Sequence, residues 1–351
     1  MMGRLLQISQ LLRAKLAPAS VRSIEQVASR TWEIAPGTTT TTPRAYFLPG
    51  QLERVTGWAF SEHHPRREME GGLQEHHGPT RAAAIDDACL LDGVLYKSSA
   101  WLHLRPRTTR WPQLRFDREL DRAAIYCTPQ GNRYFGSWLM DDCPRYELAV
   151  DEGTPVSTDQ PVSDHVRQYE QLLGMTPVRV GNARLRRVVV FDDVGQNRDR
   201  HRRFRAMAEK LLASVRAEPH PGVFLLRGTA GERRVLRGER ELAERLQRER
   251  GFRLLDPLRE DAAGIIACCA GARIVVGVEG SALIHGVLAL QPGGGLLVLQ
   301  PPHRFCGVFK HLTDRDGQRF GFVVGTPRGD DFEIDGDELE RTLDLFDQPT
   351  S

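Results

Sequence analysis

The chain has 351 residues, of which 40% are hydrophobic and 27% charged, and its 48 basic and 46 acidic side chains leave a formal net charge of +2. This length exceeds one small core and predicts about two domains, while the balanced charge argues against a nucleic-acid partner. No run approaches the roughly 18 apolar residues that span a bilayer, and the six cysteines have neither zinc-ligand nor disulfide spacing. We therefore expect a cytoplasmic globular protein with free thiols.

Residues 1–42 are predicted to form a basic amphipathic segment followed by a linker. Within residues 1–30, leucines recur with helical spacing among basic residues, and no acidic residue precedes Glu25. Such a helix can dock on the body of the protein, or it can lie on the inner face of a membrane as a peripheral contact. We prefer the docked helix and keep the membrane contact as the alternative. The Thr-rich residues 35–43 are predicted to be the linker.

Residues 43–181 are predicted to form an N-terminal α/β domain. Asp92-Gly93 lies between two apolar runs, which is typical of a two-residue hairpin turn. The segment His63–His77 is rich in His and Glu, which raises metal binding as one interpretation. Its ligands lack a convincing helical i, i+4 spacing, so we predict a solvated loop. Residues 182–186 are predicted to be the hinge that follows this domain.

The most informative stretch of the N-terminal domain is NRYFGSWLMDDCPRYEL, residues 132–148. Its aromatic residues predict an apolar helix face, and Asp141 lies one helical turn after Trp138 on the same side. A carboxylate beside an aromatic surface can lose solvation, which raises its pKa and suits a general base. Asp141 and Asp142 are therefore candidate catalytic residues. From spacing alone we prefer the simpler interpretation, in which both aspartates cap or solvate the helix end.

From residue 182 to residue 351, strands and helices alternate regularly, which predicts a second domain with a parallel, doubly wound sheet. The predicted strands are residues 188–191, 223–226, 252–255, 274–276, 296–299 and 320–324. The predicted helices are residues 199–215, 239–250, 261–270, 282–290 and 337–346. The helix at 199–215 begins with a strongly basic segment, for which we predict a solvated surface.

The segment 271–302 lies at the centre of this second domain. It combines a buried strand, the turn Glu279-Gly280-Ser281, a helix and a second buried strand. Ligands bind beyond the carboxyl ends of the strands in such sheets, and a helix N-terminus favours anions. Arg227, at the end of the predicted strand 223–226, is expected in the same crevice. The residues equally allow an ordinary strand–helix connection, in which Gly and Ser merely relieve strain.

Four cationic side chains follow strands of the C-terminal half. A planar guanidinium group can bind a phosphate through two hydrogen bonds. Together with the turn, these cations predict a metal-free diphosphate site, in which positive charge stabilises a nucleoside diphosphate as it leaves. Each cation could alternatively lie on the surface. The four residues are Arg227, Arg234, Arg304 and Lys310.

The chain resembles glycosyltransferase family 61, whose bacterial members are often described as capsular polysaccharide biosynthesis proteins. The resemblance is spread over most of residues 130–325. NRYFGSWLMDDCPR is similar to the N-domain motif of the family, and residues 225–246 are similar to its strand ending in Arg, followed by an acidic-led helix. GFRLLDP and IVVGVEGSALIHGVLALQPGGGLLVLQPP then follow in the family's order. The ordered set is more specific than any single motif.

The resemblance implies a GT-B fold, with two Rossmann-like domains facing across a cleft. The C-terminal domain would hold a nucleotide-sugar, and the N-terminal domain would bind a glycan or polysaccharide acceptor. The implied reaction is an inverting hexosyl or pentosyl transfer that needs neither a metal nor another cofactor. Carried over by position, Arg227 would contact the nucleotide phosphates, and Gly280 and Ser281 would form the turn against the diphosphate or ribose. Asp141 would bind the acceptor or act as the general base.

Two residues depart from the pattern of the family. Ser137 stands where a His commonly precedes the Trp, and Ser cannot act as a base at neutral pH without activation. Glu279 stands where a His often begins the glycine turn, and it would repel a diphosphate unless it binds ribose or sugar hydroxyls. These departures motivate a second hypothesis, a non-catalytic nucleotide-binding or scaffold member of a polysaccharide biosynthesis system. A dehydrogenase ranks third, because the turn lacks the Gly-x-Gly-x-x-Gly spacing.

Overall fold

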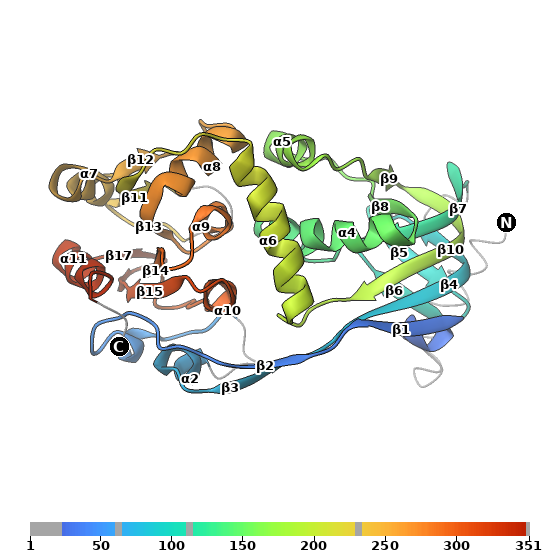
Figure 1. Cartoon of the computed structure of the whole chain (residues 1–351), viewed down its shortest axis with the longest axis horizontal. Helices are drawn as coiled ribbons and strands as arrows, with labels where there is room; N and C mark the ends of the chain where they lie inside the picture. The colour runs from blue at the N-terminus through green and yellow to red at the C-terminus, as the bar shows by residue number, and fades with distance from the viewer. Residues whose placement is uncertain (1–22, 60–64, 110–114, 229–233, 349–351) are drawn as a thin grey trace. The chain divides into compact units, whose positions relative to one another are not determined.

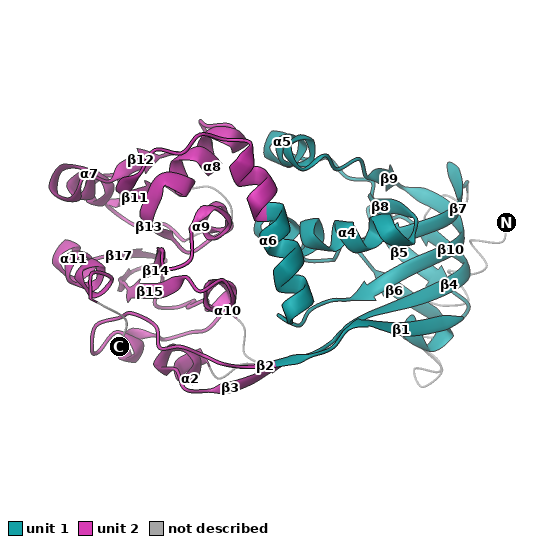
Figure 2. Cartoon of the chain, viewed as in Figure 1, with its two compact units in different colours: residues 1–38, 78–207 teal, residues 39–77, 208–351 magenta. Residues whose placement is uncertain are grey.

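The computed structural model describes residues 23–59, 65–109, 115–228 and 234–348. Contacts between residues divide the chain into two compact units, which are coloured separately in Figure 2. Unit 1 comprises residues 1–38 and 78–207, and unit 2 comprises residues 39–77 and 208–351. These units differ from the predicted segments, because residues 39–77 belong to unit 2 and residues 182–207 belong to unit 1.

Unit 1 is built on a mixed eight-stranded sheet (Figure 1). The strands in pairing order are β6 (Ala100–His103), β5 (Val94–Lys97), β4 (Thr80–Leu91), β10 (Asn182–Asp192), β7 (Arg118–Ile125), β8 (Thr154–Thr158) and β9 (Val178–Val180), and β1 (Arg30–Ala35) also pairs with β4. β4 is antiparallel to each of its partners, whereas β10, β7, β8 and β9 are parallel. This mixed sheet is less regular than the Rossmann-like domain that the family resemblance implies.

Two local predictions in unit 1 have opposite outcomes. The hairpin at Asp92-Gly93 is confirmed: it joins β4 to β5, and both residues have positive φ, as a two-residue hairpin turn of the commonest type requires. The hinge at residues 182–186 is wrong, because these residues begin β10. Ala183 and Leu185 are buried and alternate with exposed arginines, which is the pattern of a strand rather than of a loop.

The predicted linker and the predicted His-rich loop pair with each other. β2 (Thr38–Thr41) and β3 (Gln74–His77) form a two-stranded sheet, so both predictions of irregular structure are wrong at these residues. The threonines are β-branched and favour strands. Their hydroxyl groups also contact the histidines, with Thr39 Oγ1 3.2 Å from His76 Nδ1. The chain passes from unit 1 to unit 2 through β2 and returns through β3 (Figure 2).

Unit 2 contains a parallel five-stranded sheet, which confirms the predicted alternation of strands and helices. The strands in pairing order are β12 (Arg253–Leu255), β11 (His220–Leu225), β13 (Ala272–Val278), β14 (Gly295–Gln300) and β15 (Arg319–Val324). In order along the chain this is 2-1-3-4-5, the doubly wound order of flavodoxin-like folds. The direction of winding therefore reverses between β11 and β13.

Helices cover both faces of the unit 2 sheet (Figure 1). They are α7 (Glu239–Arg250), α8 (Ala262–Gly271), α9 (Leu283–Ala289), α10 (Val308–Arg315) and α11 (Gly336–Leu345). α7 and α11 share one core with β11, β13, β14 and β15, to which Phe224, Val276 and Phe346 contribute. α10 replaces a predicted loop: Phe309, Leu312 and Thr313 recur with helical spacing and are buried.

The remaining elements are short, apart from the helices α4, α5 and α6. In unit 1 they are η2 (Glu25–Val27), α3 (Phe135–Ser137), the π-helical turn η4 (Trp138–Asp142), α4 (Cys143–Glu152) and α5 (Asp164–Leu173). In unit 2 they are η3 (Leu52–Arg54), α2 (Pro65–Glu70), β16 (Thr326–Arg328) and β17 (Asp331–Glu333). α6 (Arg198–Ala213) is continuous, and the boundary between the units falls after its residue Met207 (Figure 2).

Caps and pairing explain why these segments take their places. The side chain of Asp261 accepts a hydrogen bond from Gly264 N and caps α8, and Gly251 ends α7 with a left-handed φ of 68°. Tyr46 pairs with the edge strand β15, its ring stacks on Phe346 with centroids 4.9 Å apart, and this contact places residues 39–77 in unit 2.

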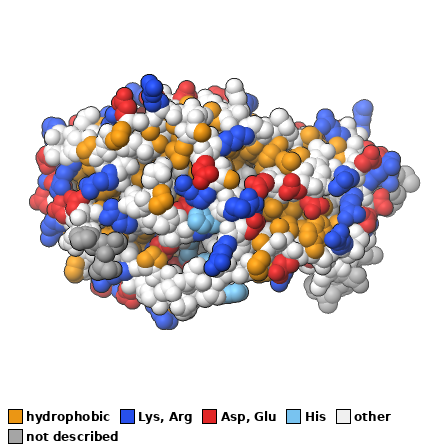
Figure 3. Space-filling view, in the orientation of Figure 1, with side chains coloured by type: hydrophobic (Ala, Val, Ile, Leu, Met, Phe, Trp, Pro, Cys, Tyr) orange, Lys and Arg blue, Asp and Glu red, His pale blue; other side chains and the backbone are white. Residues whose placement is uncertain are grey.

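The described helices give no support for a membrane-spanning segment, because none of them is both long and apolar enough to cross a bilayer. The predicted basic helix within residues 1–30 lies mostly outside the described residues. On the face drawn in Figure 3, basic and acidic side chains are interspersed, as the near-neutral net charge leads one to expect.

Candidate active-site residues

The crevice of the unit 2 sheet is expected where its winding reverses, at the carboxyl ends of β11 and β13. Arg227 follows β11 by two residues, and Glu279 directly follows β13. The two meet: Arg227 Nη1 donates a hydrogen bond to the carbonyl oxygen of Glu279 over 3.2 Å. The structure therefore confirms that Arg227 and the glycine turn share one edge of the sheet.

Gly280 permits this approach because it has no side chain. A Cβ atom at position 280 would lie 2.4 Å from Arg227 Nη1, which is closer than real carbon atoms approach such a group. The glycine that the sequence marks as a turn residue is thus required for the placement of a guanidinium group. The neighbouring Ser281 is half-buried, and its carbonyl oxygen accepts a hydrogen bond from Ile284 N over 3.3 Å.

A substitution at Gly280 is expected to act through Arg227. In the Gly280→Ala variant the new methyl group displaces the flexible end of Arg227. The φ of 156° at this position is one that residues other than glycine rarely adopt, so we expect the variant to fold with a loss of about 1–3 kcal/mol in the free energy of unfolding. If Arg227 binds an anion, the affinity should fall by about 10-fold or more, the size of one lost charged hydrogen bond. Calorimetry with a nucleoside diphosphate measures this. Wild-type affinity with an unchanged Arg227 position would contradict the prediction.

A second carboxylate fixes the loop that carries Arg227. Glu239, the first residue of α7, accepts hydrogen bonds from Arg227 N and Gly228 N, each over 2.7 Å. The sequence reasoning did not assign Glu239 a role. Its signal was the acidic residue at the first position of a predicted helix, where a carboxylate is favoured by the helix dipole and by free amide groups.

Two further predicted arginines converge on Glu279. Arg234 forms an ion pair with Glu279 Oε2, and Arg304 Nη1 lies 3.0 Å from the same oxygen. The side chains of Glu279 and Arg234 are only 6% and 9% exposed, whereas Arg304 is 29% exposed. Arg227, Arg234, Glu279, Gly280 and Arg304 therefore form one cluster, with a carboxylate at its centre.

Lys310 does not join this cluster. It lies in α10, its side chain is 1% exposed, and its ammonium group donates to Pro43 O over 2.6 Å and to Asp314 over 2.5 Å. Burial raises the pKa of Asp314 to about 6, against the opposing charge of Lys310. Lys310 thus stabilises the packing of α10 on the segment that contains Pro43.

In unit 1, Asp141 lies in the π-helical turn η4, close in space to the carboxyl ends of β7 and β10. Such wide turns occur frequently at functional sites. Its side chain is 22% exposed and forms an ion pair with Arg200, whose own side chain is 2% exposed. The expected desolvation by Trp138 is not what distinguishes Asp141, because Trp138 packs into an aromatic core with Phe135 and Tyr169.

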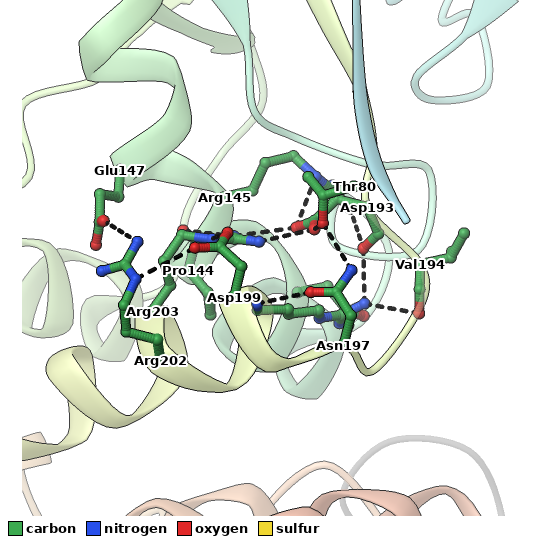
Figure 4. Close-up of polar contacts among 12 residues, drawn as sticks. Thr80, Pro144, Arg145, Glu147, Asp193, Val194, Asn197, Asp199, Arg202 and Arg203 are labelled. Carbon is green, nitrogen blue, oxygen red and sulfur yellow. Dashed lines mark hydrogen bonds and ion pairs between the residues drawn. The ribbon is translucent and has the colours of Figure 1, made fainter. Parts of the chain in front are cut away.

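The loop 193–197 holds Arg200 in place through several hydrogen bonds. Its Nη1 donates to the carbonyl oxygens of Asp193 and Val194 over 2.7 and 2.9 Å, and its backbone N donates to Asn197 Oδ1. Figure 4 shows this loop and the side chains that surround it. With its guanidinium group fixed, Arg200 orients the carboxylate of Asp141, which remains partly open to solvent.

The prediction that the basic start of α6 is solvated is wrong for Arg200 and Arg203, which are 2% and 1% exposed. Arg203 makes two hydrogen bonds to the carboxylate of Asp193, over 2.7 and 3.1 Å, and a third to Pro144 O (Figure 4). Burial alone would raise the pKa of Asp193, but the charge and hydrogen bonds of Arg203 lower it below its ordinary value. The sequence contained a signal: helical spacing places Arg200 one turn before Phe204 and Arg203 one turn before Met207, and both of these apolar residues are buried.

Asp142 lies in the interior rather than at a substrate-accessible position. Its side chain is fully buried, it accepts hydrogen bonds from Thr128 N and Thr128 Oγ, and Arg145 Nη1 lies 3.5 Å away. A Cβ atom on Gly131 would overlap its carboxylate, so the backbone also packs directly against it. Neither Asp141 nor Asp142 caps a helix, contrary to the simpler prediction. Asp141 is left as the catalytic candidate.

The pKa of Asp142 predicts a pH dependence of stability. Burial raises this pKa from 3.8 to about 8, so between these values the folded state binds a proton that the unfolded state lacks. The stabilisation is complete below the unfolded pKa and is lost as the pH rises through the folded pKa, by up to about 1.4 kcal/mol for each pH unit. Denaturation of wild type and Asp142→Asn from pH 5 to pH 9 tests this. As pH rises, the wild type should lose stability relative to Asp142→Asn. Parallel stability profiles of the two proteins would contradict the raised pKa of Asp142.

The described residues contain no group of three or more His, Cys, Asp or Glu side chains that could hold a metal ion. All six cysteines are free thiols.

Comparison with known proteins gives one family match. The family model described as Glycosyltransferase 61 matches residues 135–297. This range contains Asp141, Arg227, Arg234 and the turn at Glu279, whereas Arg304 lies beyond its end. Comparison with curated proteins finds no match. The family resemblance seen in the sequence is confirmed.

Proposed function

We propose, because residues 135–297 match the family model described as Glycosyltransferase 61, that the chain moves a sugar from a nucleotide-sugar to a glycan or polysaccharide acceptor. The observation that carries the proposal is the placement of Arg227 on Gly280, where the winding of the unit 2 sheet reverses. A guanidinium group at this edge, with Arg234 and Arg304 beside it, suits the diphosphate of a donor without help from a metal.

In this proposal the reaction is a direct displacement with inversion. The acceptor hydroxyl oxygen forms a bond to the anomeric carbon while the bond from that carbon to the diphosphate oxygen breaks. The electron pair of the broken bond leaves with the nucleoside diphosphate, where the arginines of unit 2 stabilise the developing charge. Asp141 takes the proton of the acceptor hydroxyl. Its partial exposure and its orientation by Arg200 support this role.

We assign the donor to unit 2 and the acceptor and general base to unit 1. GT-B enzymes bind donor and acceptor on separate domains in the same way. The GT-B arrangement itself, which the family resemblance implies, stays a prediction. We also propose a cytoplasmic location, with residues 1–30 as the candidate contact with a membrane. Fractionation of the full chain beside a chain without residues 1–30 tests that contact, and an unchanged distribution would reject it.

Binding measurements test the donor site. Calorimetry with a panel of nucleoside diphosphates, in the presence of a chelator, should find at least one that binds the wild-type chain. Arg227→Ala should weaken that binding by about 10- to 100-fold, the usual worth of a hydrogen bond to a charged group. Arg237→Ala is the matched control, because Arg237 is 53% exposed and pairs with Asp331. No binding by any nucleotide, with Arg227→Ala behaving like wild type, would overturn the proposal.

A second candidate is a nucleotide-binding protein of a polysaccharide assembly system that does not catalyse transfer. Two observations favour it: Ser137 occupies the position where the family commonly has His, and Glu279 forms ion pairs with two of the arginines expected to bind phosphate. Nucleotide binding without turnover over a broad acceptor panel would support this candidate. Gain of transfer in the Ser137→His variant would support it further, and clear turnover by the wild-type chain would exclude it.

A further inference from the structure

Two arginines and one glutamate of unit 2 form a cluster in which Glu279 and Arg234 are buried and the carboxylate offsets part of the positive charge. Arg234 and Arg304 approach from different loops, and both address the same atom, Oε2 of Glu279. The glutamate side chain is 6% exposed, so its carboxylate interacts mainly with these cations rather than with water. Arginines bind phosphate oxygens through the same charged hydrogen bonds that Arg234 and Arg304 make here to a carboxylate oxygen.

Arg227 is held in a different way. Its guanidinium group donates to the backbone carbonyl of Glu279 and rests on Gly280, so these two contacts do not depend on the glutamate side chain. A change in the side chain of residue 279 therefore alters the charge seen by Arg234 and Arg304 without removing what places Arg227. The role of the carboxylate can be separated experimentally from the role of the turn.

We propose that Glu279 is an internal counter-ion of Arg234 and Arg304, which a diphosphate replaces when it binds. This inference rests on the proposed function, and it assigns to Glu279 the anion specificity of the same site. A diphosphate carries several negative charges and several acceptor oxygens, so it can engage both arginines at once. A single phosphate group offers fewer charges and fewer acceptor oxygens than a diphosphate. It gains less from the two arginines than the carboxylate that it would have to displace, and it is therefore excluded.

The alternative role for the carboxylate is purely structural, holding the two arginines in place for the ligand. The two roles predict opposite effects of removing its charge. If Glu279 competes with the ligand, the neutral Glu279→Gln variant removes a negative charge beside Arg234 and Arg304 and should bind anions more tightly. If Glu279 only positions the arginines, the same variant should bind anions more weakly or equally.

Titration with inorganic pyrophosphate and with inorganic phosphate, in a chelator and at low salt, decides between these roles. We expect Glu279→Gln to bind pyrophosphate at least about 10-fold more tightly than wild type, because a like charge is removed from the site. We also expect phosphate binding, excluded in wild type, to become measurable. Glu249→Gln is the matched control, since Glu249 is 45% exposed in α7 and pairs with Arg245. It should behave like wild type.

Circular dichroism establishes that each variant is folded. Should Glu279→Gln fail to fold, Glu279→Asp serves instead: its side chain is shorter by one methylene group, which lengthens the contact with Arg304 while the buried charge remains. This variant should still bind pyrophosphate more tightly than wild type, by a smaller factor. Pyrophosphate affinity equal to or below wild type in the folded variant overturns the inference.

Pyrophosphate separates this inference from the proposed function, because it carries neither nucleoside nor sugar. Tighter pyrophosphate binding by Glu279→Gln supports the counter-ion role of Glu279 even if no nucleotide-sugar is ever turned over. If the wild type turns over a nucleotide-sugar but Glu279→Gln binds pyrophosphate more weakly, the proposed function is supported and the counter-ion role of Glu279 is rejected.

Discussion

Replacing Arg203 with alanine is expected to lower the free energy of unfolding by about 3–5 kcal/mol, the usual cost of removing one partner of a buried ion pair. Arg203 and Asp193 are both fully buried, and the bidentate contact satisfies both oxygens of the carboxylate. Without Arg203 the buried charge of Asp193 keeps a neutral hydrogen bond from Thr80 Oγ1 and the more distant Arg145, and Pro144 O loses a donor. Chemical denaturation measures the change.

The neighbouring arginine provides a matched control for this prediction. Arg202 lies in the same helix and pairs with Glu147 over 2.7 Å, but the two side chains are 56% and 44% exposed (Figure 4). Exposed pairs contribute about 0–1 kcal/mol, so Arg202→Ala should change stability little. Equal losses in the two variants would show that burial of the Arg203 pair does not determine its contribution.

Replacing Asp141 with asparagine is expected to lower the rate of sugar transfer by about 100- to 10,000-fold, the range that a general base contributes. The side chain keeps its size, and Arg200 keeps an oxygen to contact, so the loop and the fold should persist. Nucleoside diphosphate binding, which we assign to unit 2, should remain at the wild-type level. The rate of nucleoside diphosphate release at saturating donor measures the effect.

Asp164→Asn is the control for the general base. Asp164 is an 88% exposed aspartate of unit 1 that pairs with Arg167 on the surface of α5, and its replacement should leave the rate unchanged. A rate in Asp141→Asn within about 10-fold of wild type would remove Asp141 as the base. A matching loss of nucleotide affinity would instead place Asp141 at the donor.

The order of elements in unit 2 was predictable because its signals are local. Apolar β-branched runs mark strands such as β13, and capping residues such as Asp261 and Gly251 mark the ends of helices. The pairing of distant segments was not predictable from such signals. Tyr46 joins β15, more than 270 residues later, and the Thr-rich β2 finds its partner in the His-rich β3. Nothing near these segments in the sequence identifies those partners.

The candidate site was predictable where residues follow strands of one sheet. Arg227 and the turn at Gly280 meet because the carboxyl ends of β11 and β13 share an edge. Lys310 also follows a strand, yet it turns inward, since α10 places it on a buried helix face. At the basic start of α6, helical spacing could indicate that Arg200 and Arg203 lie on a buried face, but no local pattern identifies Asp193 as the carboxylate that pairs with Arg203.

Sugar transfer can be measured as release of nucleoside diphosphate from a panel of nucleotide-sugars, with mixed glycan acceptors and a chelator present. We expect the wild-type chain to release the diphosphate from at least one donor and to form a glycoside of inverted configuration, while Asp141→Asn does neither at a comparable rate. A wild-type chain that binds a nucleoside diphosphate but releases none from any donor, over a broad range of acceptors, would exclude the proposed transfer.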